Sequence, residues 1–450
     1  MEISRRKMLS TGGLGAVTLA MGRYPVAAQP PAAAVEPHDR VFVTNADSNT
    51  IAVLDPRTNT LETAINLTSF DEDPRPPFRF VTDGRAPTHA AMIHKPLYRG
   101  AIGLHGLAPS PDNRLLATAG RGSSNVYLID TTGKRVLGNT PNPQTGPGSN
   151  PERLTSGMLV GREPLGLTFT RNGRELWVAV GGEDRIAVID VEGALRGQPP
   201  VRLLVPTVNG PSQVWFSGDG GLAFVASDKV ARLDVLFLNP DPQGRSRPSH
   251  ITTLDLSAED PFGFTPFLKT SPDGSEVWLT HKLADRVSAR SARGPHGLLD
   301  SVALGALARP NHLEFVENAR GKVVYVSLAR VDEGGPNGVA SSQVAIVDRA
   351  SPSGSRRVVG SFFTRGREAH GLWTNPARTS LYVAHEQDEL TGSPHAGQTV
   401  VSAFDVTNPL APVFLAQIPL GSLTLPSGTL RNKKSVSLVY VRPGARSQTA

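Results

Sequence analysis

Short apolar runs separated by turns rich in Gly, Pro, Asn and Asp recur along most of the chain. In the stretch 369–406, an apolar run ends at the turn Asn375-Pro376, and the β-prone runs SLYVA and VVSAFDV follow it. A fourth run, PVFLAQIPL, comes directly afterwards. Runs of this length bounded by turn residues predict β-strands. The four runs are therefore expected to form one antiparallel meander, whose strands we call A to D.

Strand C is the clearest marker of the repeat, because it occurs seven times along the chain. Six of the seven copies carry an aspartate where the strand is expected to end. A short carboxylate there accepts hydrogen bonds from backbone N–H groups of the next turn, so we interpret these residues as structural. The six aspartates are Asp55, Asp130, Asp190, Asp234, Asp348 and Asp405.

Seven self-similar four-stranded units predict an all-β fold, a seven-bladed β-propeller, because such blades bury their faces only against neighbours arranged in a ring. The first unit lacks a strand A, since Arg40 leads directly into VFVTN. The apolar run from Ser435 to Val441 belongs to no unit. We predict that this run supplies the missing strand and closes the ring, which removes two exposed sheet edges.

The chain divides by composition into a leader, a linker, the repeat array and a tail. The expected boundaries are a signal peptide at 1–28, a flexible Pro/Ala-rich lead-in at 29–39, the propeller at 40–443 and a tail at 444–450. The leader combines a charged start, an apolar run too short to span a bilayer and a small-residue cleavage site.

The sequence SRRKML from Ser4 resembles a twin-arginine export signal, with Met8 where phenylalanine is usual. This resemblance implies a bacterial protein that is periplasmic or secreted. The absence of cysteine excludes disulfides, thiolate metal centres, iron–sulfur clusters and attached c-type haem. Any metal must therefore be held by imidazole, carboxylate or carbonyl groups.

The net charge of +6 is modest for 450 residues, and no basic run with interleaved aromatic residues occurs. A nucleic-acid partner is therefore not expected. No second apolar stretch after the leader is long enough to cross a membrane. We expect a monomer whose partner is a small ligand or a periplasmic protein.

The segment VFVTNADSNTIAVLDPRTNTLETAINL, from Val41 to Leu67, resembles the YVTN-type β-propeller repeat, and weaker copies cover essentially all of the chain after the lead-in. The resemblance implies the propeller fold. Its members include surface-layer and binding proteins, and related propellers host lactonases, haem-linked enzymes and copper enzymes. The family therefore implies a fold without selecting one function.

The meander topology sorts the loops into two faces. Loops D–A and B–C lie on one face, which we call the mouth face, and loops A–B and C–D lie on the other, the far face. Eight of the eleven histidines fall on the mouth face: His105, His312 and His370 at the starts of strands A, His281 and His385 at the ends of strands B, and His89, His94 and His395 in loops. The large insertions 68–103, 141–162 and 329–342 and the last B–C loop fall there too, which predicts a lid over the channel mouth.

One pair of histidines is expected to lie closest together. His370 and His385 are nearly opposite each other around one turn, where Cβ atoms are about 5 Å apart. Together with His312, His281 and His105, and with His89, His94 and His395 further out, they predict a site for a transition metal, copper or zinc. This site resembles in kind the histidine-rich copper site of the nitrous oxide reductase propeller, but the cysteine-containing electron-transfer domain of that enzyme is missing.

The competing interpretation is that each histidine hydrogen-bonds a loop carbonyl and that no cofactor is held. Arg367, Glu368, Glu386 and Asp388 lie beside the pair and are candidate acids, bases or supports for a ligand. Three functions stay open: an exported propeller that binds a ligand or partner, a metal-dependent periplasmic oxidoreductase, and a lactonase-type hydrolase. Whether the protein is an enzyme is left undecided by the sequence.

Overall fold

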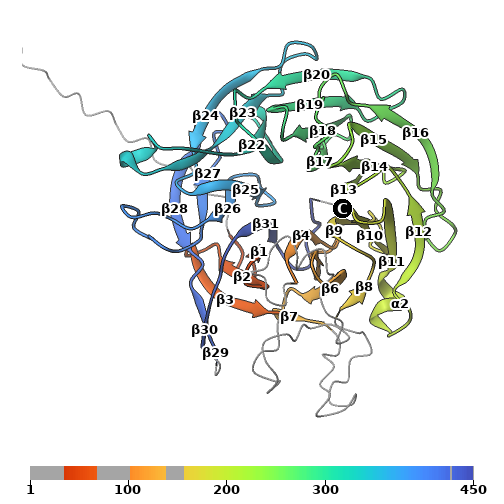
Figure 1. The fold of residues 1–450 in the computed structure, drawn as a ribbon, viewed down its shortest axis with the longest axis horizontal. Coiled ribbons are helices and arrows are strands. Elements are labelled where there is room, and N and C mark those ends of the chain that lie inside the picture. Colours follow the sequence, from red (N-terminus) through yellow and green to blue (C-terminus); the bar gives the residue numbers. More distant parts are fainter. Residues whose placement is uncertain (1–34, 68–101, 138–156, 426–427, 449–450) are drawn as a thin grey trace, which may run out of the picture.

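The computed structural model describes residues 35–67, 102–137, 157–425 and 428–448. The predicted signal peptide and the outer candidates His89 and His94 lie outside these ranges. The strands form seven antiparallel blades arranged in a ring, as the repeat predicts (Figure 1). In the part of the chain that is described, no helix is long and apolar enough to cross a membrane.

Each blade runs from an inner strand at the channel to an outer strand at the rim (Figure 1). Blade 1 consists of β31 (Ser435–Val441), β1 (Arg40–Asn45), β2 (Thr50–Asp55) and β3 (Thr60–Asn66), and blade 2 of β4 (Leu104–Pro109), β5 (Leu115–Gly120), β6 (Asn125–Asp130), β7 (Arg135–Val136) and β8 (Met158–Leu159). Blade 3 consists of β9 (Pro164–Phe169), β10 (Glu175–Val180), β11 (Arg185–Asp190) and β12 (Val201–Pro206). Blade 4 consists of β13 (Pro211–Phe216), β14 (Leu222–Ser227), β15 (Arg232–Phe237) and β16 (Ser249–Asp255).

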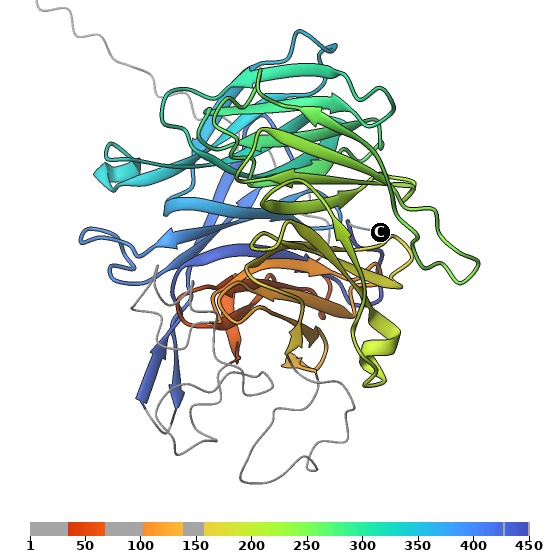
Figure 2. The same ribbon diagram turned by 45° about the vertical axis from the view of Figure 1, so that its right-hand side comes forward.

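The other three blades repeat the same order. Blade 5 consists of β17 (Phe267–Thr270), β18 (Glu276–His281), β19 (Arg286–Ser291) and β20 (Leu298–Ala303). Blade 6 consists of β21 (Pro310–Asn318), β22 (Gly321–Asp332), β23 (Ser341–Asp348) and β24 (Val358–Phe363). Blade 7 consists of β25 (Arg367–Thr374), β26 (Ser380–Gln387), β27 (Val400–Asp405) and β28 (Val413–Pro419). Outside the blades lie α2 (Val191–Leu195), a 3-10 turn η1 (Pro336–Gly338) and the hairpin β29 (Ser422–Leu425) and β30 (Gly428–Arg431), which projects from the ring in both views (Figure 2).

The ring is closed as the sequence predicts. Strand β31 takes the inner position of blade 1 and pairs with β1, so that Arg40 lies opposite Val441 and Val43 opposite Leu438. Beyond the paired strands, Asp39 accepts hydrogen bonds from Oη of Tyr440 at 2.6 Å and from Nε of Arg442 at 2.8 Å. The prediction of C-terminal closure is therefore confirmed.

Five of the six repeat aspartates end strand C and accept a hydrogen bond from a backbone N–H two or three residues later, as expected. Asp234 is the exception, because β15 begins at Arg232, two residues after the start of the predicted run, and continues to Phe237. Asp234 therefore lies inside the strand, where it accepts hydrogen bonds from the backbone N–H of Val208 and from Oγ1 of Thr253. The prediction of a turn-closing role for Asp234 was wrong.

The apolar core lies between neighbouring blades. The mid-strand residues of strands A, B and C are buried on both sides of each sheet, because every blade is covered by the next one. Trp177 of blade 3 meets Phe216 of blade 4 edge to face, with ring centroids 5.4 Å apart, and Trp278 of blade 5 meets Phe315 of blade 6 at 6.4 Å. The apolar packing that stabilises each blade is therefore made with its neighbours and not within the blade.

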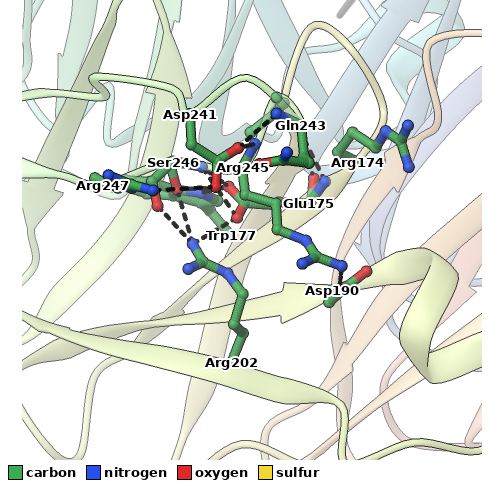
Figure 3. Close-up of polar contacts among 12 residues, drawn as sticks. Arg174, Glu175, Trp177, Asp190, Arg202, Asp241, Gln243, Arg245, Ser246 and Arg247 are labelled. Carbon is green, nitrogen blue, oxygen red and sulfur yellow. Dashed lines mark hydrogen bonds and ion pairs between the residues drawn. The ribbon is translucent and has the colours of Figure 1, made fainter.

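Each of these two tryptophans lies two residues after a buried glutamate that binds the following blade. Glu175 starts β10, and its carboxylate accepts hydrogen bonds from Ser246 of blade 4 and from Arg202 at 2.6 Å (Figure 3). Glu276 starts β18 and accepts hydrogen bonds from Nε of Arg349 at 2.8 Å and from Nη2 of Arg356 at 2.5 Å, both from blade 6. We call these two glutamates the interblade glutamates.

The lid predicted from the insertions is not formed by the loops that the structure describes. The B–C connections of blades 6 and 7 extend beyond their outer strands (Figures 1 and 2). In blade 2, β7 and β8 both pair with β6, so these two short strands together form the outer strand of the blade. The 141–162 insertion therefore interrupts this outer strand and does not belong only to the loop that leads to blade 3. Most of 68–103 lies outside the described residues.

The segment after β31 crosses the far face of the channel. Backbone N–H groups of Gly444 and Ser447 donate to the carbonyls of Asp112 and Pro111, both at 2.8 Å. The side chain of Gln448 then reaches into the ring, where its Nε2 donates to the carbonyl of Thr374 at 2.9 Å. The part of the tail that the structure describes is therefore fixed to blades 2 and 7.

Candidate ligand site at the channel mouth

Three of the predicted histidines meet at the mouth of the channel. His105, His312 and His370 come from the inner strands β4, β21 and β25 of blades 2, 6 and 7. The ring centroids of His312 and His370 are 4.9 Å apart, and those of His105 and His370 are 5.9 Å apart. His312 also stacks on Phe267 of blade 5, at 4.2 Å and 12°. We call the three histidines the mouth cluster.

A shared irregularity of the inner strands places these rings. The pairing of strand A with strand B shifts between Leu104 and Leu107, between Pro310 and Leu313, and between Ala369 and Leu372. Each histidine lies within the interrupted part of its strand. A bulge locally redirects a strand and its side chains, and bulges are frequent next to functional sites. The repeat therefore offers the same local distortion to three different blades.

The mouth cluster is uncharged at neutral pH. Burial lowers the pKa of His312 to about 3, and the positive charge of Lys282 adds to this effect. Burial also lowers the pKa of His105 and of His370 well below the usual value, with Arg121 the next cause for His105 and His312 the next for His370. Neutral imidazoles can accept a proton or ligate a metal, because each keeps a nitrogen lone pair.

Glu386 lies against the cluster. Its Oε1 is 3.3 Å from Nε2 of His370, and its Oε2 is 3.5 Å from Nζ of Lys434. Burial, followed by the nearby charge of Glu368, raises the pKa of the Glu386 carboxyl. Because His370 is neutral, its contact with Glu386 is a polar contact rather than an ion pair. Val436 lies beside the His370 ring, yet Nδ1 has no hydrogen bond of regular geometry among the described residues.

His385 and His281 lie inside their blades. His385 is paired with Ala369, so the expected position opposite the start of β25 is confirmed. Its ring is fully buried, however, with Nδ1 at 3.0 Å from the carbonyl of Val400. His281 contacts Oγ1 of Thr265 at 2.9 Å and Oγ of Ser288 at 2.7 Å. Side chains alternate across a strand, so Glu386, and not His385, contacts His370.

The remaining candidates lie apart from the cluster or are engaged elsewhere. Arg367 donates to the carbonyl of Asp388 at 2.8 Å, and the Asp388 carboxylate pairs with Arg431 at 2.7 Å. Glu368 accepts a hydrogen bond from Gln387 at 2.8 Å. His395 lines a separate hollow between the outer parts of blades 6 and 7. Among the residues that the structure describes, no three or more His, Cys, Asp or Glu side chains are arranged to hold a metal.

A cleft of about 460 Å³ opens beside the mouth cluster, and sequence reasoning missed it. Its lining consists of Lys282, Leu307, Arg309, Ala329, Arg330, Val331, Glu368 and Gln387, and we call it the mouth cleft. Lys282 joins the cleft to the cluster, because its Nζ donates to Oδ1 of Asn311, the neighbour of His312, at 2.6 Å. Burial lowers the pKa of Lys282. The signal was present in VWLTHK, where a lysine follows the mouth-face histidine.

No family model and no curated protein matches this sequence. Solved structures do match its fold. A periplasmic gluconolactonase of Pseudomonas aeruginosa has a TM-score of 0.53 and 15% identity, covering 90% of this chain and 99% of that one. A protein from Lactobacillus plantarum has a TM-score of 0.58 and 12% identity over 90% and 99% of the two chains. Kuenenia stuttgartiensis hydrazine synthase has a TM-score of 0.51 and 16% identity over 71% and 87%. At these identities the likeness concerns the fold alone.

Proposed function

We propose that this propeller binds a small organic anion, of the carboxylate class, in the mouth cleft. The observation that carries the proposal is the placement of Lys282, whose ammonium lies between the cleft and the mouth cluster. Lys282, Arg309 and Arg330 line the cleft against one carboxylate, that of Glu368. Leu307, Ala329 and Val331 add apolar surface to the cleft, and charged groups that converge on a concave site can fix the orientation of a small ligand.

The partners of these cations decide which of them are available to a ligand. Arg330 pairs with Asp332 at 2.9 Å and also donates to the carbonyl of Ala306. Among the described residues, the Lys282 ammonium donates to the amide oxygen of Asn311 and forms no ion pair, although the charges of Glu386 and Glu368 act to raise its pKa. The Lys282 ammonium is therefore available to a ligand carboxylate, and Arg309, at the start of blade 6, is the second such cation.

Replacing Lys282 with methionine is expected to weaken binding of gluconate by about tenfold or more, because a charge-assisted hydrogen bond is lost. Arg309→Met should weaken it in the same direction. Isothermal titration calorimetry at constant ionic strength measures both effects, with neutral glucose as the comparison ligand. Lys322→Met is the matched control, since Lys322 is an exposed lysine outside the cleft. Gluconate binding no tighter than glucose binding, or an equal loss in Lys322→Met, would refute the proposal.

Hydrolysis of a lactone is the second candidate function, and the contact between His370 and Glu386 favours it. In this reaction water attacks the ring carbonyl, the ring C–O bond breaks, and the ring oxygen takes up a proton to give a hydroxy acid. A neutral imidazole keeps a lone pair for the proton of the attacking water, and the Glu386 carboxylate beside it would stabilise the imidazolium that then forms. The cations of the mouth cleft would then meet the carboxylate of the product. The fold shared with a gluconolactonase is compatible with this candidate.

For this candidate, His370→Asn is expected to lower the enzyme-catalysed opening of glucono-δ-lactone by about 100-fold, the usual contribution of a general base. The rate above spontaneous hydrolysis is measured with a pH indicator. His38→Asn, which changes an exposed histidine on the far side of β1, should leave the rate unchanged. A wild-type rate equal to the spontaneous one would leave the protein as a binding propeller without this activity.

A bound metal stays a prediction of the sequence. Nδ1 of His370, which makes no hydrogen bond of regular geometry with the described residues, could ligate a transition metal, but these residues supply no three-ligand arrangement around it. The lactone assay therefore includes a chelator arm and arms with added zinc or copper. Activity lost to the chelator and restored by one metal would support the prediction, and chelator-resistant activity would speak for side chains alone.

We also propose that the protein acts in the periplasm as a member of the YVTN-type propellers. The support is the leader with Arg5 and Arg6 and the repeat from Val41 to Leu67. The ligand proposal does not depend on the export route.

A further inference from the structure

The far end of the channel contains a small, strongly basic cavity. Its volume is about 130 Å³, and it lies where the A–B turns of blades 3, 4, 5 and 7 meet β21 and the C-terminal tail. Four cationic side chains line it, and the one carboxylate in its lining is that of Glu314. The four cations are Arg171, Lys269, Arg378 and Arg446.

The charge of Glu314 is already matched. Both carboxylate oxygens of this buried residue accept hydrogen bonds from Nζ of Lys269, at 3.0 and 2.9 Å. Lys269 also lies over the ring of Trp373, with Nζ 4.0 Å from the centroid, and donates to Oε1 of Gln448 at 3.0 Å. The Lys269–Glu314 pair is therefore neutral as a unit, and the arginines provide a surplus of positive charge in the cavity.

Arg171 is held in place by neutral acceptors. Its Nε donates to the carbonyl of Ser217 at 3.1 Å and its Nη2 to the carbonyl of Phe216 at 2.9 Å. The pKa of Arg171 is lowered to about 10, mainly by burial and secondly by the positive charge of Arg446. The nearby carboxylate of Asp219 acts in the other direction, but Asp219 belongs to an exposed turn and does not line the cavity.

Arg378 contributes a second guanidinium to the cavity, and this one, unlike that of Arg171, has no fixed partner among the described residues. It lies in the A–B turn of blade 7, and its side chain makes no hydrogen bond or ion pair with the residues that the structure describes. Its charge and that of Arg171 both act to lower the pKa of Lys269, for which burial is the largest cause. Like charges thus face one enclosed space from three blades, an arrangement that a bound anion would relieve.

We propose that this far-end cavity is a binding site for a small inorganic oxyanion, phosphate or sulfate. Guanidinium groups match the oxygens of such ions through paired N–H donors. The volume of about 130 Å³ is several times the space that one water molecule needs, so an ion of this size can enter the cavity. The site is separate from the mouth cleft, because the two share no lining residue.

A bound oxyanion would join parts of the ring that the backbone does not connect directly. The cavity takes residues from blades 3 to 7, and Arg446 and Gln448 belong to the tail that follows β31. Anion binding is therefore expected to stabilise the attachment of the tail to the ring. Any ligand that binds only the folded state raises the apparent stability in proportion to the logarithm of its concentration.

The test is calorimetric titration of the whole protein with sodium phosphate and sodium sulfate, with sodium chloride at matched ionic strength as the reference. The expected result is saturable binding of one oxyanion per chain and a melting temperature that rises with its concentration. Arg378→Met is expected to weaken the binding on the order of tenfold. Because the Arg378 side chain supports no described contact, this variant should fold normally.

Arg320→Met is the matched control, since Arg320 is exposed, lies in another far-face turn and does not line the cavity. Arg171→Met serves as a second variant. Its phosphate binding is titrated only if its melting curve is cooperative, which shows that the variant is folded. The proposal is overturned if phosphate and sulfate act no more strongly than chloride, or if Arg320→Met weakens binding as much as Arg378→Met. Phosphate binding that survives Arg378→Met but is lost in Lys282→Met would assign the anion to the mouth cleft and also overturn it.

Discussion

A chain that ends at residue 432 is expected to be unfolded at room temperature. The truncation removes β31, in which Val436, Leu438, Val439, Tyr440 and Val441 are all buried. At about 1.5–3 kcal/mol for each large apolar side chain, the loss is on the order of 10 kcal/mol, comparable with the total stability of an ordinary domain. It also leaves β1 without its inner partner and removes the strand of blade 1 that packs against β25 of blade 7. Circular dichroism and urea unfolding measure the effect.

The control for this truncation is a chain that ends at Arg442. It keeps β31 and the contacts of Tyr440 and Arg442 with Asp39, and it loses only the tail that crosses the far face. We expect this chain to fold with a lowered melting temperature. If the chain ending at residue 432 melted as the full chain does, the closing role of β31 would be wrong despite the observed pairing.

Glu276→Gln is expected to lower the free energy of unfolding by about 1.5–3 kcal/mol at neutral pH, the usual size for buried hydrogen bonds to a charged group. The substitution replaces the carboxylate shared by Arg349 and Arg356, both nearly buried, with a neutral amide. The two arginines keep their other carboxylate partners, which are Asp273 and Glu317 for Arg349 and Asp300 for Arg356. Buried hydrogen bonds from Trp278 Nε1 and from both arginines hold the carboxylate. Denaturant unfolding of the two proteins measures the difference.

The same substitution should change the acid stability. Burial raises the pKa of Glu276, but the hydrogen bonds from Trp278, Arg349 and Arg356 outweigh it and leave the pKa below the usual 4.5. A carboxyl group whose pKa is lower in the folded state than in the unfolded state stabilises the protein at pH values above its unfolded-state pKa. This stabilisation is lost as the pH falls towards and through the folded-state pKa. The wild-type protein should therefore lose more stability below pH 4.5 than Glu276→Gln. Glu333→Gln, at an exposed site, should show neither effect.

The fold was predictable from the sequence because the repeat imposes it. Seven copies of one strand, six of which carry an aspartate, leave few other ways to bury the blades, and one unassigned strand at Ser435 fitted the one vacant position at Arg40. The error at Asp234 arose because the pattern of VARLDV is compatible with two strand boundaries, and burial of the following Val235 and Leu236 decided between them.

The site was predictable only in part, because topology fixes the face of a residue but not the direction of its side chain. Sorting by face brought His105, His312 and His370 to one mouth, where the structure places them together. It did not distinguish His385 from Glu386, since neighbouring residues point to opposite sides of a strand. Lys282 was missed because loop lysines are mostly solvated, and its burial depends on the packing of blades 5 to 7.

The interblade glutamates could have been found in the sequence. RELWVAV and SEVWLTH place a glutamate two residues before a tryptophan at the start of strand B in blades 3 and 5. An acidic residue followed by an apolar run looks like an ordinary solvated strand start, so its burial was not anticipated. The residues that complete each contact are distant in sequence: Arg202 and Ser246 for Glu175, and Arg349 and Arg356 for Glu276.

The pairing of β31 with β1 makes the order of the blades along the chain partly arbitrary. Arg40 and Val441 lie opposite each other in one sheet, so the backbone is a circle that is cut inside blade 1. Joining the two ends by a short linker and reopening the chain in an A–B turn of another blade would give a circular permutant with the same seven contacts between blades. The closing strand β31 therefore keeps the ring of blades unbroken, and this role does not depend on the blade in which the chain begins.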